Sequence, residues 1–127
     1  MLVALVFCLG CSSTDKIHDI ILSEYPDEFE YIKYDQGREF SKRYVEKGDP
    51  EYDKLLQLIS SADTGWQRDY ITYAPKDIFV SPRMCINIVN DIVIINCNSE
   101  ANKMGQVIRK VDREIINGIL NKNKYEE

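Results

Sequence analysis

The chain has little of what metal sites and nucleophilic active sites are made of. His18 is the only histidine among 127 residues, so a zinc site with two histidines cannot form. Neither Cys85 nor Cys97 has an imidazole partner that would activate its thiol, and no nucleophile motif or phosphate-binding loop occurs. We therefore expect no metal, no cofactor and no enzymatic activity. Acid–base chemistry by two carboxylates stays open, because twenty-one Asp and Glu residues are available and their spacing does not give their geometry.

A run of basic residues is also missing. Sixteen Lys and Arg residues are scattered along the chain and are outnumbered by the acids, which leaves a formal net charge of −5. Domains that bind nucleic acid usually carry a clustered basic surface, so we expect no nucleic-acid partner. Hydrophobic residues make up 44% of the sequence, which is typical of a globular protein, and the length suits one domain.

No apolar run is long enough to cross a membrane. The stretch MLVALVFCLGC at the N-terminus has eleven residues, whereas a spanning helix needs roughly 20. Its length and composition instead fit the apolar part of a secretory signal. The basic residues that normally begin such a signal are missing, so the recorded start can lie inside it.

The end of this stretch carries a second signal. Gly10 directly precedes Cys11, and two serines follow. This order resembles a bacterial lipobox, in which the cysteine is lipidated and the signal is cut before it. The usual pattern has Leu three places before the cysteine, where this chain has Cys8. Cys8 is a poorer candidate for lipidation, because the bulky Phe7 stands where a small residue is expected.

These features predict the organisation and the location of the protein. We expect a signal peptide over residues 1–10, a lipidated Cys11 with a tether over 11–16, a single domain over 17–121 and a frayed polar tail over 122–127. The resemblance to lipoproteins implies a lipid-anchored protein of the cell envelope that faces the periplasm or the exterior. The membrane is then one partner, reached through the lipid.

The strongest pattern in the remaining sequence is a β-hairpin. Residues 84–89 and 92–97 are rich in β-branched residues, and Asn90-Asp91 separates them as a two-residue turn. This turn pairs Val89 with Ile92 and places one set of side chains on a wholly apolar face, which we expect to be buried. That set is Met84, Ile86, Ile88, Val93, Ile95 and Cys97.

The same register determines whether Cys85 and Cys97 can form a disulfide. It places Cys85 opposite Asn96 and sends the two sulfur atoms to opposite faces of the hairpin. A three-residue loop would set Cys85 opposite Cys97 and allow a disulfide, but it would mix polar and apolar residues on both faces. We therefore expect two free thiols, with Cys97 buried and Cys85 on the other face.

Three segments have helical spacing. A short helix is predicted over residues 15–24, ended by Pro26, with His18 exposed to solvent. Asp49-Pro50 predicts the start of a second helix over 50–62, where Asp49 acts as the cap. A third helix is expected over 112–120, with apolar positions that include Ile115. We expect Leu55, Leu56 and Ile115 to be buried together with Ile86 and Ile95.

Further strands are predicted around the hairpin. They cover residues 28–34, 39–47, 66–73 and 78–80, although a helical turn stays open for 39–47. Residues 100–111 fit either a helix continuous with the last one or a strand that ends before Asp112. The fold class that follows is α+β, a small antiparallel sheet of four to six strands with amphipathic helices on one face.

The aromatic residues suggest where a partner could bind. Tyr31, Tyr34, Trp66 and Tyr70 could form an exposed concave patch, although tyrosine is also a common strand residue. The function we expect is a small, non-catalytic, lipid-anchored envelope protein that binds a protein or ligand partner, as inhibitors, immunity proteins and assembly accessories do. The alternative is a structural envelope lipoprotein without a defined pocket.

Overall fold

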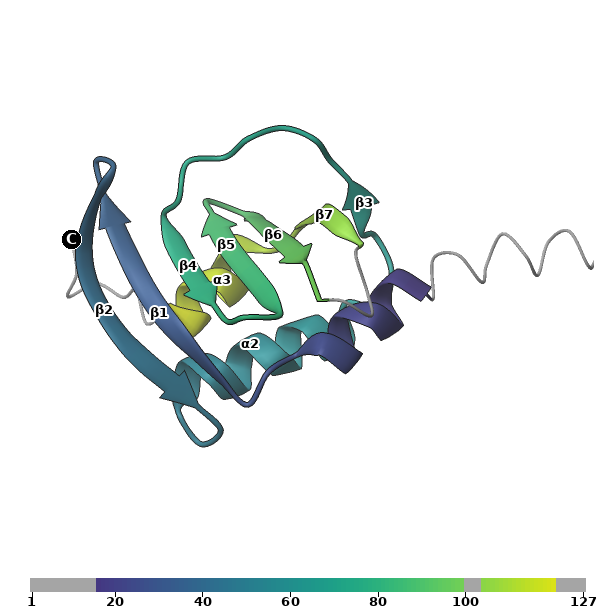
Figure 1. Cartoon of the computed structure of the whole chain (residues 1–127), viewed down its shortest axis with the longest axis horizontal. Coiled ribbons are helices and arrows are strands. Elements are labelled where there is room, and N and C mark those ends of the chain that lie inside the picture. Colours follow the sequence, from purple (N-terminus) through teal and green to yellow (C-terminus); the bar gives the residue numbers. More distant parts are fainter. Residues whose placement is uncertain (1–15, 100–103, 121–127) are drawn as a thin grey trace, which may run out of the picture.

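Seven strands form one antiparallel sheet in the order β2-β1-β4-β5-β6-β7-β3. The structure is a computed structural model that describes residues 16–99 and 104–120 (Figure 1). A helix over residues 16–24 is followed by β1 (Glu28–Asp35), β2 (Arg38–Glu46), α2 (Pro50–Ser61), β3 (Gln67–Arg68), β4 (Asp77–Val80), β5 (Met84–Val89), β6 (Ile92–Cys97), β7 (Gly105–Lys110) and α3 (Arg113–Ile119). The predicted α+β class with an antiparallel sheet is confirmed.

The sheet has one strand more than the six predicted at most. The segment that fitted either a helix or a strand adopts the strand alternative, and β7 pairs with β6 along six residues. β3 keeps two residues of the strand predicted over 66–73, and they pair with Val107 and Ile108 of β7. The sheet therefore has seven strands instead of four to six.

The central hairpin has the predicted register. Val89 pairs with Ile92 and Cys85 with Asn96, around a turn in which Asn90 has a φ of 57°. All six residues of the predicted core face are buried. Cys97 lies on this face and Cys85 on the other, and both thiols are free, as the pattern predicts.

The core lies between this face of the sheet and the three helices. Ile21, Leu55, Ile59, Ile116 and Ile119 supply the helical part of the buried cluster. In Figure 1, α3 lies behind β4 and β5, and α2 runs below the strands. The other face of the sheet has no helix packed on it among the described residues, and we call it the outer face.

The helices have nearly the bounds predicted from the sequence, but one of the two predicted caps is different. Pro50 begins α2, but the Asp49 carboxylate turns away from the helix and accepts the Glu46 N–H at 2.8 Å. Asp112 does cap α3, because its Oδ1 accepts the Glu114 N–H at 3.0 Å.

Two predicted core residues are not fully buried. Leu56 only packs at the edge of the cluster, and Ile115 is 49% exposed. α3 has seven residues and buries Ile116 and Ile119. Neighbouring helical positions are about 100° apart around the axis, so Ile115 points away from the buried side.

His18 differs from its prediction as well. It is half-buried instead of solvated, and its Nε2 lies 3.1 Å from the Ile59 carbonyl oxygen near the end of α2. This contact joins the 16–24 helix to α2.

The predicted strand over residues 66–73 is wrong beyond its second and third residues. Only Gln67–Arg68 pairs with the sheet, and the chain then leaves the edge as a loop that returns at β4. Side chains of the sheet satisfy polar groups of this loop's backbone, so it needs no strand partner.

Some predictions fall outside the described residues. These are the signal peptide, Cys11 with most of the tether, and the polar tail. Within the part of the chain that the structure describes, no helix is both long and apolar enough to cross a bilayer.

Candidate functional site

Two long rows of side chains run across the strands on the outer face of the sheet. The first row joins paired residues of six strands and is mostly apolar: Lys42, Ile32, Ile78, Asn87, Ile94 and Ile108. The second row lies beside it and is more polar: Tyr44, Glu30, Val80, Cys85, Asn96 and Gln106. Helices do not cover these rows in the described structure, so their surroundings depend on loops.

The loop between β3 and β4, residues 69–76, covers one half of this face. Gln106 Nε2 donates to the Ile71 carbonyl at 2.8 Å, and Asn87 Nδ2 donates to the Ala74 carbonyl at 3.2 Å. The Asn87 side-chain oxygen accepts the Lys76 N–H at 3.1 Å. These amides lie on β5 and β7, so the 69–76 loop is attached to that half of the sheet. Ile94 on β6, between them, is only 2% exposed.

The loop also holds its own shape through Asp69. The Asp69 carboxylate accepts the Ile71 N–H at 2.7 Å and the Tyr73 hydroxyl at 2.8 Å. These hydrogen bonds lower the pKa of Asp69, and the bond from the Ile71 N–H has the largest effect. The bond between Tyr73 and Asp69 in turn raises the pKa of the Tyr73 hydroxyl. Tyr70 is 90% and Ile71 62% exposed, so the loop presents two large apolar side chains to solvent.

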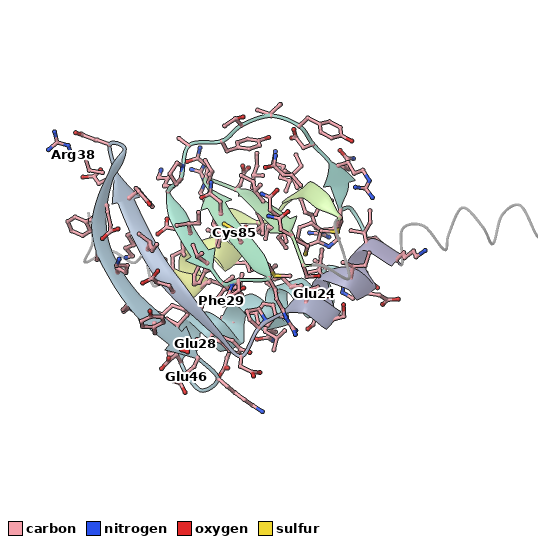
Figure 2. All side chains as sticks on the ribbon, viewed as in Figure 1. Glu24, Glu28, Phe29, Arg38, Glu46 and Cys85 are labelled. Atoms are coloured by element: carbon pink, nitrogen blue, oxygen red, sulfur yellow. The ribbon has the colours of Figure 1, made fainter. Side chains whose placement is uncertain are left out.

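The other half of the outer face is uncovered by the loop. Its apolar residues lie on four adjacent strands and are half-buried by their neighbours, except for Tyr44, which is 66% exposed on the edge strand. We call them the open patch: Ile32, Ile78, Val80, Cys85 and Tyr44. Cys85 lies near the middle of the sheet, as Figure 2 shows. Glu30 lies between Tyr44 and Val80 within the patch, and its side chain forms an ion pair with Lys42 at 3.9 Å.

The four aromatic residues singled out from the sequence do not form one exposed patch. Tyr31 is 2% and Trp66 6% exposed, so both belong to the core. Tyr34 is half-buried on β1, and only Tyr70 is fully displayed. The predicted binding face from these residues is therefore corrected, because two of them supply core packing instead.

Tyr31 belongs to a buried polar network. Its hydroxyl donates to Asp77 Oδ1 at 2.9 Å, and burial together with this carboxylate raises the pKa of Tyr31. The Arg43 guanidinium stacks over the Tyr31 ring at 5.5 Å and pairs with Glu51 of α2. Since these contacts tie β1, β2, β4 and α2 together, we assign the network to stability.

The two thiols are poor nucleophiles in this fold. Burial raises the pKa of Cys85, and burial together with the nearby Glu24 raises that of Cys97 to about 11. Thiolate is the reactive form, so both are weakly reactive near neutral pH. No group of three metal-ligating side chains occurs among the described residues.

None of three hollows on the described surface brings together groups suited to catalysis. A groove of 360 Å³ between α2 and α3 is lined by residues such as Lys54, Leu58 and Ile115. A smaller hollow of 180 Å³ lies beside Asp77, and a third of 470 Å³ lies along the C-terminal half of β7, beside Gln67 of β3 and Ile92 of β6. In the third hollow Arg109 is occupied, because its side chain donates to the Thr64 carbonyl.

The open patch as a unit was not predicted from the sequence. Of its residues, only Cys85 was placed in advance, on the second face of the hairpin. Ile32, Ile78 and Val80 join that face only through the pairing of β4 with β1 and β5. That pairing is non-local and has no local sequence signal.

Comparisons with protein families, with curated proteins and with solved structures found no match for this chain.

Proposed function

We propose that this chain is a small, non-catalytic protein of the cell envelope, anchored by lipid on Cys11, that binds a protein or ligand partner through the open patch. The observation that carries the binding role is the uncovered apolar surface on four adjacent strands. Exposed apolar patches of soluble domains often mark contact sites, and aromatic residues such as Tyr44 contribute strongly to them.

The surroundings of the open patch support a contact of this kind. Its aliphatic side chains are fixed on a hydrogen-bonded sheet, so little conformational entropy is lost when a partner covers them. The ion pair between Lys42 and Glu30 adds charged groups that can fix the orientation of a partner. The weakly reactive thiols and the occupied polar groups favour binding over catalysis.

The anchor is tested by labelling with radioactive palmitate. We expect label in the wild type and in Cys8→Ser, and none in Cys11→Ser. Labelling that persists in Cys11→Ser and disappears in Cys8→Ser would place the lipid on the other cysteine. Equal labelling of all three proteins would contradict the lipobox interpretation.

The binding face is tested by site-specific photo-crosslinking in intact envelopes. A photoreactive residue at Val80 or Tyr44 should give one discrete crosslinked product. The same residue at Gln57, exposed on α2 at the opposite side of the sheet, is the matched control and should not give it. A product formed equally well from Gln57, or no product from either patch position, would refute this face as the binding site.

A further inference from the structure

We infer that the 69–76 loop is a second membrane contact, in which Tyr70 and Ile71 enter the lipid interface beside the anchor. This inference rests on the proposed lipid anchor at Cys11. It assigns a different surface from the open patch, and its occupant is the lipid surface itself.

The tether keeps one end of the domain close to the bilayer. Only four residues separate Cys11 from Lys16, where the described chain begins. A fully extended chain covers at most about 3.6 Å per residue. Lys16 therefore lies within roughly 18 Å of Cys11, the residue that carries the lipid. That distance is smaller than the diameter of a small domain, and the end of the domain that carries Lys16 therefore faces the membrane.

The loop begins at that same end. The 16–24 helix contacts the end of α2 through His18 and Ile59, and Trp66 donates its indole N–H to the Ala62 carbonyl at 2.6 Å. β3 follows Trp66 directly, so the chain enters the loop beside this helix. Figure 1 shows the 16–24 helix and β3 at one end of the molecule and the β1–β2 hairpin at the other.

The loop displays its apolar side chains in a fixed conformation. Asp69 and Gln106 hold the N–H and the carbonyl of Ile71, so this part of the backbone cannot turn its side chains back onto the sheet without losing both bonds. Tyr70 and Ile71 are the most exposed apolar pair that is adjacent in the described chain. A tyrosine beside an aliphatic residue suits the membrane interface, where one end of the ring is apolar and the other is hydrated.

A basic residue stands on each side of the loop. Arg68 precedes the pair and Lys76 follows it, and both residues are exposed, while the Arg68 guanidinium also donates to the Met104 carbonyl. Cationic side chains next to an inserted aromatic are favoured at anionic lipid surfaces. The acidic neighbours are less accessible, because the Asp69 carboxylate accepts the Ile71 N–H and the Tyr73 hydroxyl inside the loop and Asp77 is only 3% exposed.

The test uses the full lipidated chain in vesicles of phosphatidylethanolamine and phosphatidylglycerol that contain brominated acyl chains, which quench nearby tryptophan. Trp66 is the only native tryptophan and is buried, so it gives a constant background. Tyr70→Trp reports on the loop. Tyr44→Trp is the matched control, because Tyr44 is also exposed but lies on β2 at the far edge of the sheet.

We expect Tyr70→Trp to lose emission in brominated vesicles and to shift to shorter wavelength, while Tyr44→Trp keeps the emission that it has in unbrominated vesicles. If the vesicles carry the protein on flotation but neither variant is quenched, the loop contact is refuted and the anchor stands. Equal quenching of both variants refutes the orientation. If neither Tyr70→Trp nor Cys11→Ser floats with the vesicles, the proposed lipid anchor at Cys11 is refuted. The inference of a second membrane contact is then refuted as well.

Discussion

Replacing Ile95 by alanine tests the central assignment of the fold, the face of the sheet that is buried. Ile95 is fully buried on β6, between Ile86 of β5 and Val107 of β7. The substitution removes three carbon atoms, which forfeits about 2.4 kcal/mol at roughly 0.8 kcal/mol per methylene. The cavity that remains adds to this, so we expect a total loss of about 3–4 kcal/mol in the free energy of unfolding.

The matched control is Ile92→Ala on the same strand. Ile92 lies an odd number of residues from Ile95, so its side chain is on the outer face, where it is half-buried. Removing the same three carbons there should cost about 1 kcal/mol, because part of the side chain is already in water and no closed cavity forms. Both variants lose the same three carbon atoms, so the difference between their losses in unfolding free energy reports only which face of the sheet is buried.

Urea unfolding followed through the emission of Trp66 measures both losses. This single tryptophan is 6% exposed in the folded protein, so its emission changes when the core opens. The slope of the free energy against urea should stay the same in both variants. A loss near zero for Ile95→Ala, or a larger loss for Ile92→Ala, would refute the assignment of the faces.

Three further predictions follow from single contacts. Tyr31→Phe removes the hydrogen bond to the buried Asp77 carboxylate and should cost about 1.5–3 kcal/mol in urea unfolding; an unchanged midpoint would contradict the structural role of this bond. In the folded protein at pH 8, Cys97 should resist alkylation because burial raises its pKa to about 11, whereas both Cys85 and Cys97 should be labelled after unfolding without reductant, as peptide mapping can show; an unlabelled pair would mean a disulfide. The folded-state pKa of Asp69 is lowered from its ordinary value of 3.8, so the order that it gives the 69–76 loop is present above that pH and is lost as the pH falls through the lowered pKa. Hydrogen exchange should show the loop amides protected at pH 7 in the wild type and less so in Asp69→Ala, and equal protection in the two proteins would contradict the role of this carboxylate.

Local patterns determined much of the fold. The alternation of residues 84–97 around Asn90-Asp91 gave one register with segregated faces, and this register is the observed one. Pro50 marked the start of α2, and Asp112 marked the cap of α3. These signals act over a few residues, because turns, caps and side-chain periodicity depend on neighbouring positions along the chain.

The tertiary structure decided what depends on distant partners. Residues 66–73 have the composition of a strand, but β7 pairs with only two of them, and the amides of Asn87 and Gln106 hold the loop that follows. Tyr31 is buried with its hydroxyl donating a hydrogen bond to Asp77, 46 positions away along the chain. The sequence by itself therefore determined most of the helices and strands and the inward face of the hairpin, and the lipid anchor stays a prediction. The order of the strands, the half of the outer face that stays open and the display of Tyr70 arise from non-local pairing, which no local pattern encodes.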